Sequence, residues 1–390
     1  MAAELFSYHL VLLSREWALC LFLQTLFKRP DLAVRVSEVE ISSVSRVPPT
    51  ALCGLNSICR SPTWQYSVGQ NRHADLILVL LQLVPKLQRL HFPVLGIGLF
   101  GELSQSSLLT SSSTSIKTLV FSGFKHDYLL NRAVPIIQRA PNLKVFLCYK
   151  HARFTKLFAT SLGRKTPTGP SPLQNLTELS LVDTSITEPS FCNPLRAAGP
   201  RLLRLNIRRT ARLPSVDDDS RVVRFDDVLA ALQPWHHTLK ELSFTMYGMD
   251  RMVLSQESHR FGGVHLLREF HAPEILWTQA AFLDFSGHLE PKEDALNSTL
   301  TTSICELRLF GYGNPAPALQ GLVETVMSGQ FADLRTVEID DQGSEGYELD
   351  GEVQDLRDVG ASFRSAGVTF TVHAQPEEPQ VPVKSETAET

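Results

Sequence analysis

The chain has 390 residues, 43% hydrophobic and 20% charged, which excludes a collagen-like, coiled-coil or globally disordered protein. Its formal net charge of −4 is too small for the whole-molecule field of a typical nucleic-acid-binding protein. Six cysteines are spread along the chain and form no Cys-x-x-Cys pair, so neither a disulfide scaffold nor a zinc motif is indicated. A reducing, intracellular location, cytoplasmic or nuclear, suits them.

The N-terminal stretch is apolar but not continuously so. Arg15 and Glu16 interrupt it, so the uncharged run is too short to span a membrane. Glu4 stands where a secretory signal carries positive charge. We expect residues 1–35 to form an N-terminal helical cap.

A six-residue pattern then recurs: an apolar residue, two mostly polar residues, an apolar residue, a variable residue and an apolar residue. The pattern is loose, but from Leu87 onward its copies begin 26 to 37 residues apart, about one supersecondary unit each. Three copies also have Pro two residues ahead, more than the proline content would give by chance. The copies begin at Leu87, Ile116, Leu143, Leu176, Leu202, Leu239, Leu267, Ile304 and Leu334, with a more distant one at Val36.

Helical periodicity separates many of these copies, at residues 74–84, 127–139, 225–232, 319–327 and 353–363. One strand–turn–helix unit cannot cover its own apolar face, whereas stacked units share a core and pair their strands into a parallel sheet. The prediction is an α/β solenoid with parallel strands on its concave face and helices on its convex face.

The solenoid is expected to span residues 36–372, with its last strand at residues 368–372. Residues 373–390 are rich in Pro, Glu and Thr and are expected to be a disordered tail.

These units resemble leucine-rich repeats of the long, irregular kind, although the position where that family places Asn or Cys holds other residues. No inner asparagine ladder is therefore expected. Four phrases also resemble fungal proteins that carry an F-box followed by leucine-rich repeats: Lys28-Arg-Pro-Asp-Leu-Ala33, Val36-Ser-Glu-Val-Glu-Ile41, Leu83-Val-Pro-Lys-Leu87 and Leu266-Leu-Arg-Glu-Phe270.

This resemblance covers roughly residues 17–372. It implies a substrate-receptor role in ubiquitin-ligase targeting, with a cullin-ligase adaptor subunit as one partner. An F-box would begin with a Leu-Pro pair, and the residues ahead of the Arg29-Pro30 phrase contain none. The F-box itself is therefore not evident.

Motifs of catalysis or ligand binding are weak. Gly96-Ile-Gly-Leu-Phe-Gly101 has dinucleotide-site spacing, but the segment after it is mostly Ser and Thr and does not open a helix. We interpret it as a loop between repeats, with a nucleotide-dependent enzyme as a distant alternative. His236 and His237 lack the i, i+4 spacing of a metal-binding helix. We expect no enzyme, and no catalytic residue, cofactor or metal.

Two segments carry opposite charge. Residues 128–177 contain eight basic and no acidic residues, and residues 340–358 contain eight acidic residues and one basic. The first segment fits a solvated convex face or a patch that steers an acidic or phosphorylated protein partner. Nucleic acid is not expected, because aromatic residues do not interleave with the basic ones. The second would close the stack with a polar outer side.

Alternation along the strands assigns side chains to the open face. Four apolar side chains on that face, Val120, Val145, Leu147 and Tyr149, are typical of a recognition hot spot. A covering loop or a register shifted by one residue would explain them equally. We predict a protein–protein interaction module, substrate-receptor-like, with a stand-alone scaffold as the alternative. Its expected partner-binding residues are Val120, Val145, Leu147, Tyr149, Arg204, Arg208, Glu241, Glu269, His271 and Arg308.

Overall fold

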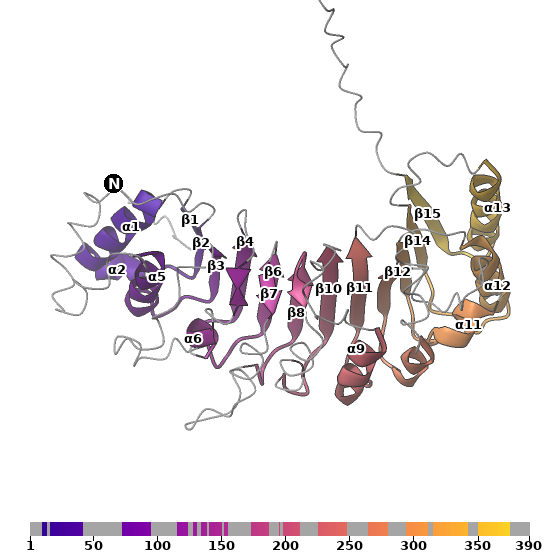
Figure 1. Cartoon of the computed structure of the whole chain (residues 1–390), viewed down its shortest axis with the longest axis horizontal. Helices are drawn as coiled ribbons and strands as arrows, with labels where there is room; N and C mark the ends of the chain where they lie inside the picture. Colours follow the sequence, from indigo (N-terminus) through magenta and orange to yellow (C-terminus); the bar gives the residue numbers. More distant parts are fainter. Residues whose placement is uncertain are drawn as a thin grey trace, which may run out of the picture.

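The structure, a computed structural model, describes part of the chain. The described residues are 10–13, 16–41, 72–94, 115–123, 128–130, 134–138, 140–149, 152–154, 173–186, 195, 198–210, 225–247, 264–279, 294–310, 315–341 and 350–374. They form an elongated arc in which a sheet lines the inner side and the helices lie along the outer side and at both ends (Figure 1).

The main sheet has twelve strands within the described residues, and every neighbouring pair is parallel. In spatial order they are β1 (Leu10–Leu13), β2 (Glu38–Ile41), β3 (Arg89–Val94), β4 (Thr118–Gly123), β6 (Val145–Tyr149), β8 (Glu178–Val182), β10 (Arg204–Thr210), β11 (Glu241–Tyr247), β12 (Ile275–Gln279), β13 (Glu306–Phe310), β14 (Thr336–Asp341) and β15 (Thr369–Ala374). Spatial order follows chain order, so the predicted α/β solenoid with a parallel concave sheet is confirmed.

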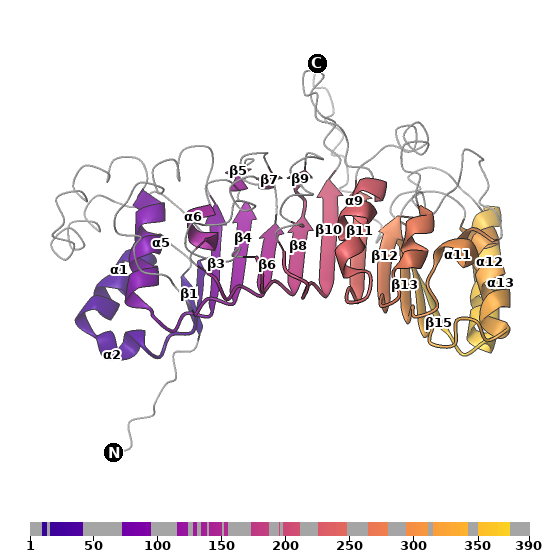
Figure 2. The ribbon, with the colours of Figure 1, turned by 90° about the horizontal axis from the view of Figure 1, so that it is seen from below.

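Three short strands form a second parallel sheet, β5 (Tyr128–Leu129), β7 (Ala152–Phe154) and β9 (Ser185–Ile186). They lie beyond the carboxyl ends of β4, β6 and β8 (Figure 2). In each of these three repeats a strand of the main sheet is therefore followed by a strand of the second sheet.

The helices occupy the intervals between strands. They are α1 (Glu16–Lys28), α2 (Pro30–Ala33), α5 (Arg72–Leu83), α6 (Val134–Ile137), α9 (Phe225–Leu232), α11 (Ala295–Thr299), α12 (Ala316–Met327) and α13 (Asp350–Ser365), with 3-10 helices η4 (Gln233–Trp235) and η6 (Val264–Glu269). No helix of the described residues is long and apolar enough to cross a membrane.

One predicted helix was largely wrong. Residues 127–139 were expected to be helical, but they contain strand β5 and then only the four-residue helix α6. Pro135 is the second residue of α6 and explains why the helix begins so late, because a proline has no amide donor and is tolerated only in the first turn of a helix. The N-terminal segment likewise contains strand β1 ahead of α1 and α2, and the last strand runs to Ala374, two residues beyond its expected end.

One carbonyl just ahead of each main-sheet strand from β2 to β13 holds neighbouring repeats together. It accepts hydrogen bonds from two successive amides of the next repeat; for example, Thr177 O accepts from the amides of Leu203 and Arg204 at 2.9 and 3.0 Å. The acceptors run through Ser37, Gln88, Lys117, Lys144, Thr177, Leu203, Lys240, Glu274 and Cys305. This backbone ladder links the repeats in the absence of the asparagine ladder that the family resemblance would imply.

Hydroxyl side chains add a second inter-repeat contact. The residue just before the first apolar position reaches back to a carbonyl of the preceding repeat: Ser115 Oγ donates to Leu87 O at 2.8 Å, and Ser303 Oγ donates to Pro273 O at 2.7 Å. Asn175 does the same through its amide, donating to Pro141 O at 3.0 Å. Such bonds satisfy turn carbonyls that stacking would otherwise bury unpaired.

The core is one continuous apolar cluster that runs from Leu13 to Val368. Three of its aromatic residues lie in adjacent strands, where Phe92 and Phe121 meet edge to face with ring centroids 4.9 Å apart, and Phe121 and Phe146 do so at 5.5 Å. These edge-to-face contacts suit the charge distribution of aromatic rings. They continue the core across the boundary between one repeat and the next.

The predicted strand that begins at Leu267 is wrong. Leu267 lies in η6, and the strand of this repeat is β12, in which Leu276 pairs with Leu242 of β11. Leu267 and Phe270 are buried three residues apart, a spacing that fits one face of a helical turn as well as the repeat pattern. Buried Pro273 takes the first apolar position instead.

Candidate recognition surface on the open strand face

The strand register sorts the open-face side chains of β2 to β15 into rows that cross the main sheet. The first row, at the strand starts, contains Glu38, Arg89, Thr118, Val145, Glu178, Arg204, Glu241, Ile275, Glu306, Thr336 and Thr369. The middle row, two residues further along each strand, contains Glu40, His91, Val120, Leu147, Ser180, Asn206, Ser243, Trp277, Arg308, Glu338 and Thr371.

An apolar strip on β6 is formed by Val145, Leu147 and Tyr149, all half-buried. The alternate residues of that strand, Phe146 and Cys148, are in the core. Leu147 therefore belongs to the open face and the register predicted for β6 is correct. Burial raises the pKa of Tyr149, with Glu178 as the next contributor, so its hydroxyl stays neutral at physiological pH.

Beside this strip the face changes in depth. Val120 lies next to Leu147 in the middle row but is only 3% exposed. Its side chain therefore supports the strip and is not itself accessible to a partner. On the other side the middle row continues with the short side chains of Ser180, Asn206 and Ser243 before it reaches Trp277. Two large side chains thus flank a stretch of small ones.

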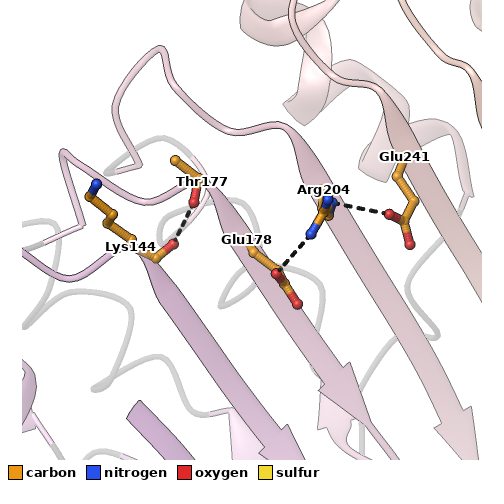
Figure 3. Close-up of polar contacts among 5 residues, drawn as sticks. All are labelled: Lys144, Thr177, Glu178, Arg204 and Glu241. Carbon is orange, nitrogen blue, oxygen red and sulfur yellow. Dashed lines mark hydrogen bonds and ion pairs between the residues drawn. The ribbon is translucent and has the colours of Figure 1, made fainter. Parts of the chain in front are cut away.

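An ion-pair ladder crosses three strands in the first row (Figure 3). Arg204 of β10 lies between two carboxylates, 3.5 Å from Glu178 of β8 through Nη1 and 3.3 Å from Glu241 of β11 through Nε. At the neighbouring strand starts Thr177 Oγ1 donates to the carbonyl of Lys144 at 3.0 Å. The arginine is 61% exposed and the two carboxylates less than a third, so the carboxylates sit deeper in the face than their cation.

The surroundings of Glu241 in this ladder shift the pKa of its carboxyl. Burial raises its pKa above the ordinary 4.5, Arg204 lowers it, and Glu178 and Glu306 raise it again. Arg204 thus only partly compensates the cost of holding Glu241 charged.

An aromatic and charged cluster occupies β12 to β15. Trp277 Nε1 donates to Glu306 at 3.1 Å, and the guanidinium of Arg308 lies 4.3 Å from the centre of the Trp277 ring. Arg308 also pairs with Glu338, which His373 approaches at 3.5 Å. The indole is held at its N–H by a hydrogen bond and at one ring face by a cation–π contact.

The N-terminal part of the face holds one histidine. His91 Nδ1 lies 3.4 Å from Glu40, and Nε2 lies 3.2 Å from Ser122 Oγ. Burial lowers the pKa of His91 more than Glu40 raises it. The ring is therefore largely neutral at physiological pH and contributes hydrogen bonding more than charge.

Most of the predicted partner-binding residues lie on this face, including Arg208 of β10, which is 4.0 Å from Asp183. The two exceptions are Glu269 and His271. Glu269 ends η6 and accepts a hydrogen bond from Gln233, and His271 donates its amide to His236 O at 3.0 Å. Placing Glu269 and His271 on the open face was wrong, because the strand of their repeat begins at Ile275.

Because the strand of this repeat lies at β12, two open-face residues were missing from the prediction. Ile275 and Trp277 take the open-face positions that had been given to Glu269 and His271. The run Ile-Leu-Trp-Thr-Gln at residues 275–279 has the β-branched and aromatic content of a strand. That composition is the sequence signal for this strand. The repeat pattern misses it because Pro273 and Thr278 stand where the pattern requires apolar residues.

Several other predictions fall outside the described residues. These are the glycine motif at residues 96–101 and the basic residues of the 128–177 segment, apart from Lys144 and the backbone of Arg153. Of the two histidines considered as metal ligands, His237 stacks against His271 with ring centroids 5.5 Å apart, and its ring is tilted against that of His236 with centroids 3.7 Å apart. In the described ranges no group of three or more His, Cys, Asp or Glu could hold a metal ion.

Comparisons with known proteins assign no family. No family model matches the chain, and no curated protein does. A solved structure of a Bacteroides fragilis protein matches with a TM-score of 0.31 and 9% identity, covering 85% of each chain. A likeness of that degree transfers no function, so any functional conclusion rests on the open face itself.

Proposed function

We propose that this chain is a protein-recognition module that binds a protein partner on the open strand face. The observation that carries the proposal is the apolar strip Val145, Leu147 and Tyr149, which lies half-buried on the inner face of the sheet beside charged side chains. Apolar side chains at the centre of a surface, rimmed by polar ones, are typical of protein interfaces. The single curved sheet also offers a long contact area of the kind that solenoids use.

The test is the substitution Leu147→Asp. Leu147 is outside the core, so the variant should keep the melting temperature of the parent within a few degrees. An aspartate in the strip would have to be desolvated on binding, and we expect capture of the partner to fall by at least about 100-fold, which is about 2.7 kcal/mol. Affinity capture from the source cells with quantitative mass spectrometry measures this.

Glu324→Gln on the outer helix α12 is the matched control, because Glu324 is exposed away from the open face. Proteins retained by the parent and by this control but lost in Leu147→Asp are the expected result. Proteins retained equally by all three would contradict the proposal, and a large fall in melting temperature would show that Leu147 supports the core.

The narrower version of the proposal is a substrate receptor of a ubiquitin ligase, and it rests on the family resemblance of the sequence. Its test uses α1, where Leu21 and Phe27 are each 50% exposed while Leu19, Leu23 and Leu26 are buried. If α1 docks on a cullin-ligase adaptor subunit, Leu21→Asp with Phe27→Asp should abolish co-purification of that adaptor and leave the fold intact. An adaptor that never co-purifies with the parent favours the stand-alone scaffold.

A further inference from the structure

The open face carries more acid than base. The first and middle rows together hold six carboxylates, Glu38, Glu40, Glu178, Glu241, Glu306 and Glu338, against three arginines, Arg89, Arg204 and Arg308. The basic residues that suggested an acidic partner lie, apart from Lys144 and the backbone of Arg153, outside the described residues. The charge of the described face points to a partner of the opposite sign.

Two of these carboxylates lie close together between β11 and β13. Glu241 and Glu306 lie in the same row with only Ile275 between them. Glu241 shares Arg204 with Glu178, and Glu306 accepts the indole N–H of Trp277. Two carboxylates therefore flank one half-buried isoleucine beside an indole ring.

This composition matches one kind of side chain. Lysine and arginine combine an aliphatic stem, which could cover Ile275, with a cationic end that could reach both carboxylates. The raised pKa of Glu241 agrees with this geometry, because burial and the neighbouring acids outweigh the effect of Arg204. A second cation would supply the missing compensation.

We propose that the open face binds an extended partner segment in which a basic side chain lies over Ile275 between Glu241 and Glu306, and an apolar side chain lies on Leu147 and Tyr149. This inference rests on the proposed function and adds the chemistry of the partner. Strand β12 is four strands from β6 in the sheet. At about 4.8 Å per strand and about 3.3 Å per extended residue, the two side chains are about six residues apart.

The experiment uses defined probes. Two pools of fluorescent peptides of about twelve residues carry leucine at one position and, about six residues on, arginine in one pool and glutamate in the other. Their remaining positions are the same mixture of small polar residues. Binding to the full chain is measured by fluorescence polarisation at low and at high salt.

We expect the arginine pool to bind at least about tenfold tighter than the glutamate pool, and added salt to reduce the difference. The double variant Glu241→Gln with Glu306→Gln should bring the two pools to within about twofold, while Glu324→Gln should not. Leu147→Asp should weaken both pools. Thermal melting establishes that each variant is folded.

Each other outcome overturns a specific claim. Pools that bind equally, or a preference for glutamate, with binding still lost in Leu147→Asp, would overturn the basic-partner inference and leave the proposed function standing. Binding that is unchanged in Leu147→Asp, or that neither pool shows, would count against the open face as a recognition surface and against the inference with it.

Discussion

Glu241 shows how stacked strands shape the chemistry of single residues. Its carboxylate lies one strand from Arg204 and two strands from both Glu178 and Glu306. Parallel pairing at about 4.8 Å per strand keeps all four side chains on one side at fixed spacing. Burial, which is the largest contribution, and the two acids raise its pKa against the single lowering contribution of Arg204.

We predict that the carboxyl carbon of Glu241 titrates above pH 4.5 in an NMR experiment, and higher still in Arg204→Met, which removes the group that lowers its pKa. Because the folded state then holds this proton more tightly than the unfolded state, stability falls as pH rises from 4.5 through the raised pKa. Glu241→Gln removes this loss, so its stability relative to the parent should increase over that window. Titration at or below 4.5 would contradict the prediction.

At this scale the sequence predicts which side chains share a face, and not which of them meet. Alternation alone identified Leu147 as outward-facing between Phe146 and Cys148. The contact of Arg204 with Glu178 joins residues 26 apart in the chain. It depends on the exact register between repeats, and variable interval lengths hide that register from the sequence.

At the scale of the repeat, Gly199 marks a close approach of two units. Its amide donates to Leu173 O of the preceding repeat at 3.2 Å, and its carbonyl accepts from Trp235 Nε1 of the following one at 2.8 Å. A β-carbon at this position would lie 1.9 Å from the carbonyl oxygen of Gln174. The constraint is backbone against backbone, so no side-chain rotation can relieve it.

Gly199→Ala should therefore lower the free energy of unfolding by about 3 kcal/mol. Gly329→Ala is the matched comparison, because Gly329 has a φ of 85° with open space around its missing β-carbon, and the left-handed backbone alone costs about 1 kcal/mol. Urea denaturation of both variants measures the difference. Equal losses would mean that the repeats move apart at Gly199 at no greater cost than the left-handed backbone imposes at Gly329.

Helices and strands were predictable where the sequence fitted only one periodicity, helical or strand-like. Helix α9 has its expected bounds, and helices α5, α12 and α13 lie within three residues of theirs. The pattern failed at Leu267 because apolar residues three apart fit both a strand-start motif and a helical turn. It failed ahead of α6 because Pro135 breaks an otherwise helical period.

At the scale of the whole molecule, each repeat contacts mainly its sequence neighbours. The carbonyl ladder, the strand pairs and the continuous core all join one unit to the next. Stability in such an array is close to a sum of local terms and nearest-neighbour terms. The repeat interval read from the sequence already implied this arrangement, whereas the net acid of the open face emerged only once strand order and register were known.

A weakened repeat in the middle of the array should therefore uncouple its two sides, whereas the same change near an end should not. Leu205 of β10 and Leu90 of β3 occupy equivalent core positions and are both fully buried. Leu205→Ala and Leu90→Ala should each cost about 3 kcal/mol locally. Only Leu205→Ala should split urea unfolding into two steps, each with a smaller denaturant dependence, because each half exposes less surface than the whole.

Hydrogen exchange in moderate urea, followed by mass spectrometry, locates the steps. In Leu205→Ala, peptides from β3 to β6 and from β11 to β14 should lose protection at different urea concentrations. In Leu90→Ala both sets should open together, because the array beyond the weakened repeat remains continuous. Joint opening in Leu205→Ala as well would show that coupling extends beyond nearest neighbours, and the open face would then behave as one rigid surface rather than as a row of adjustable units.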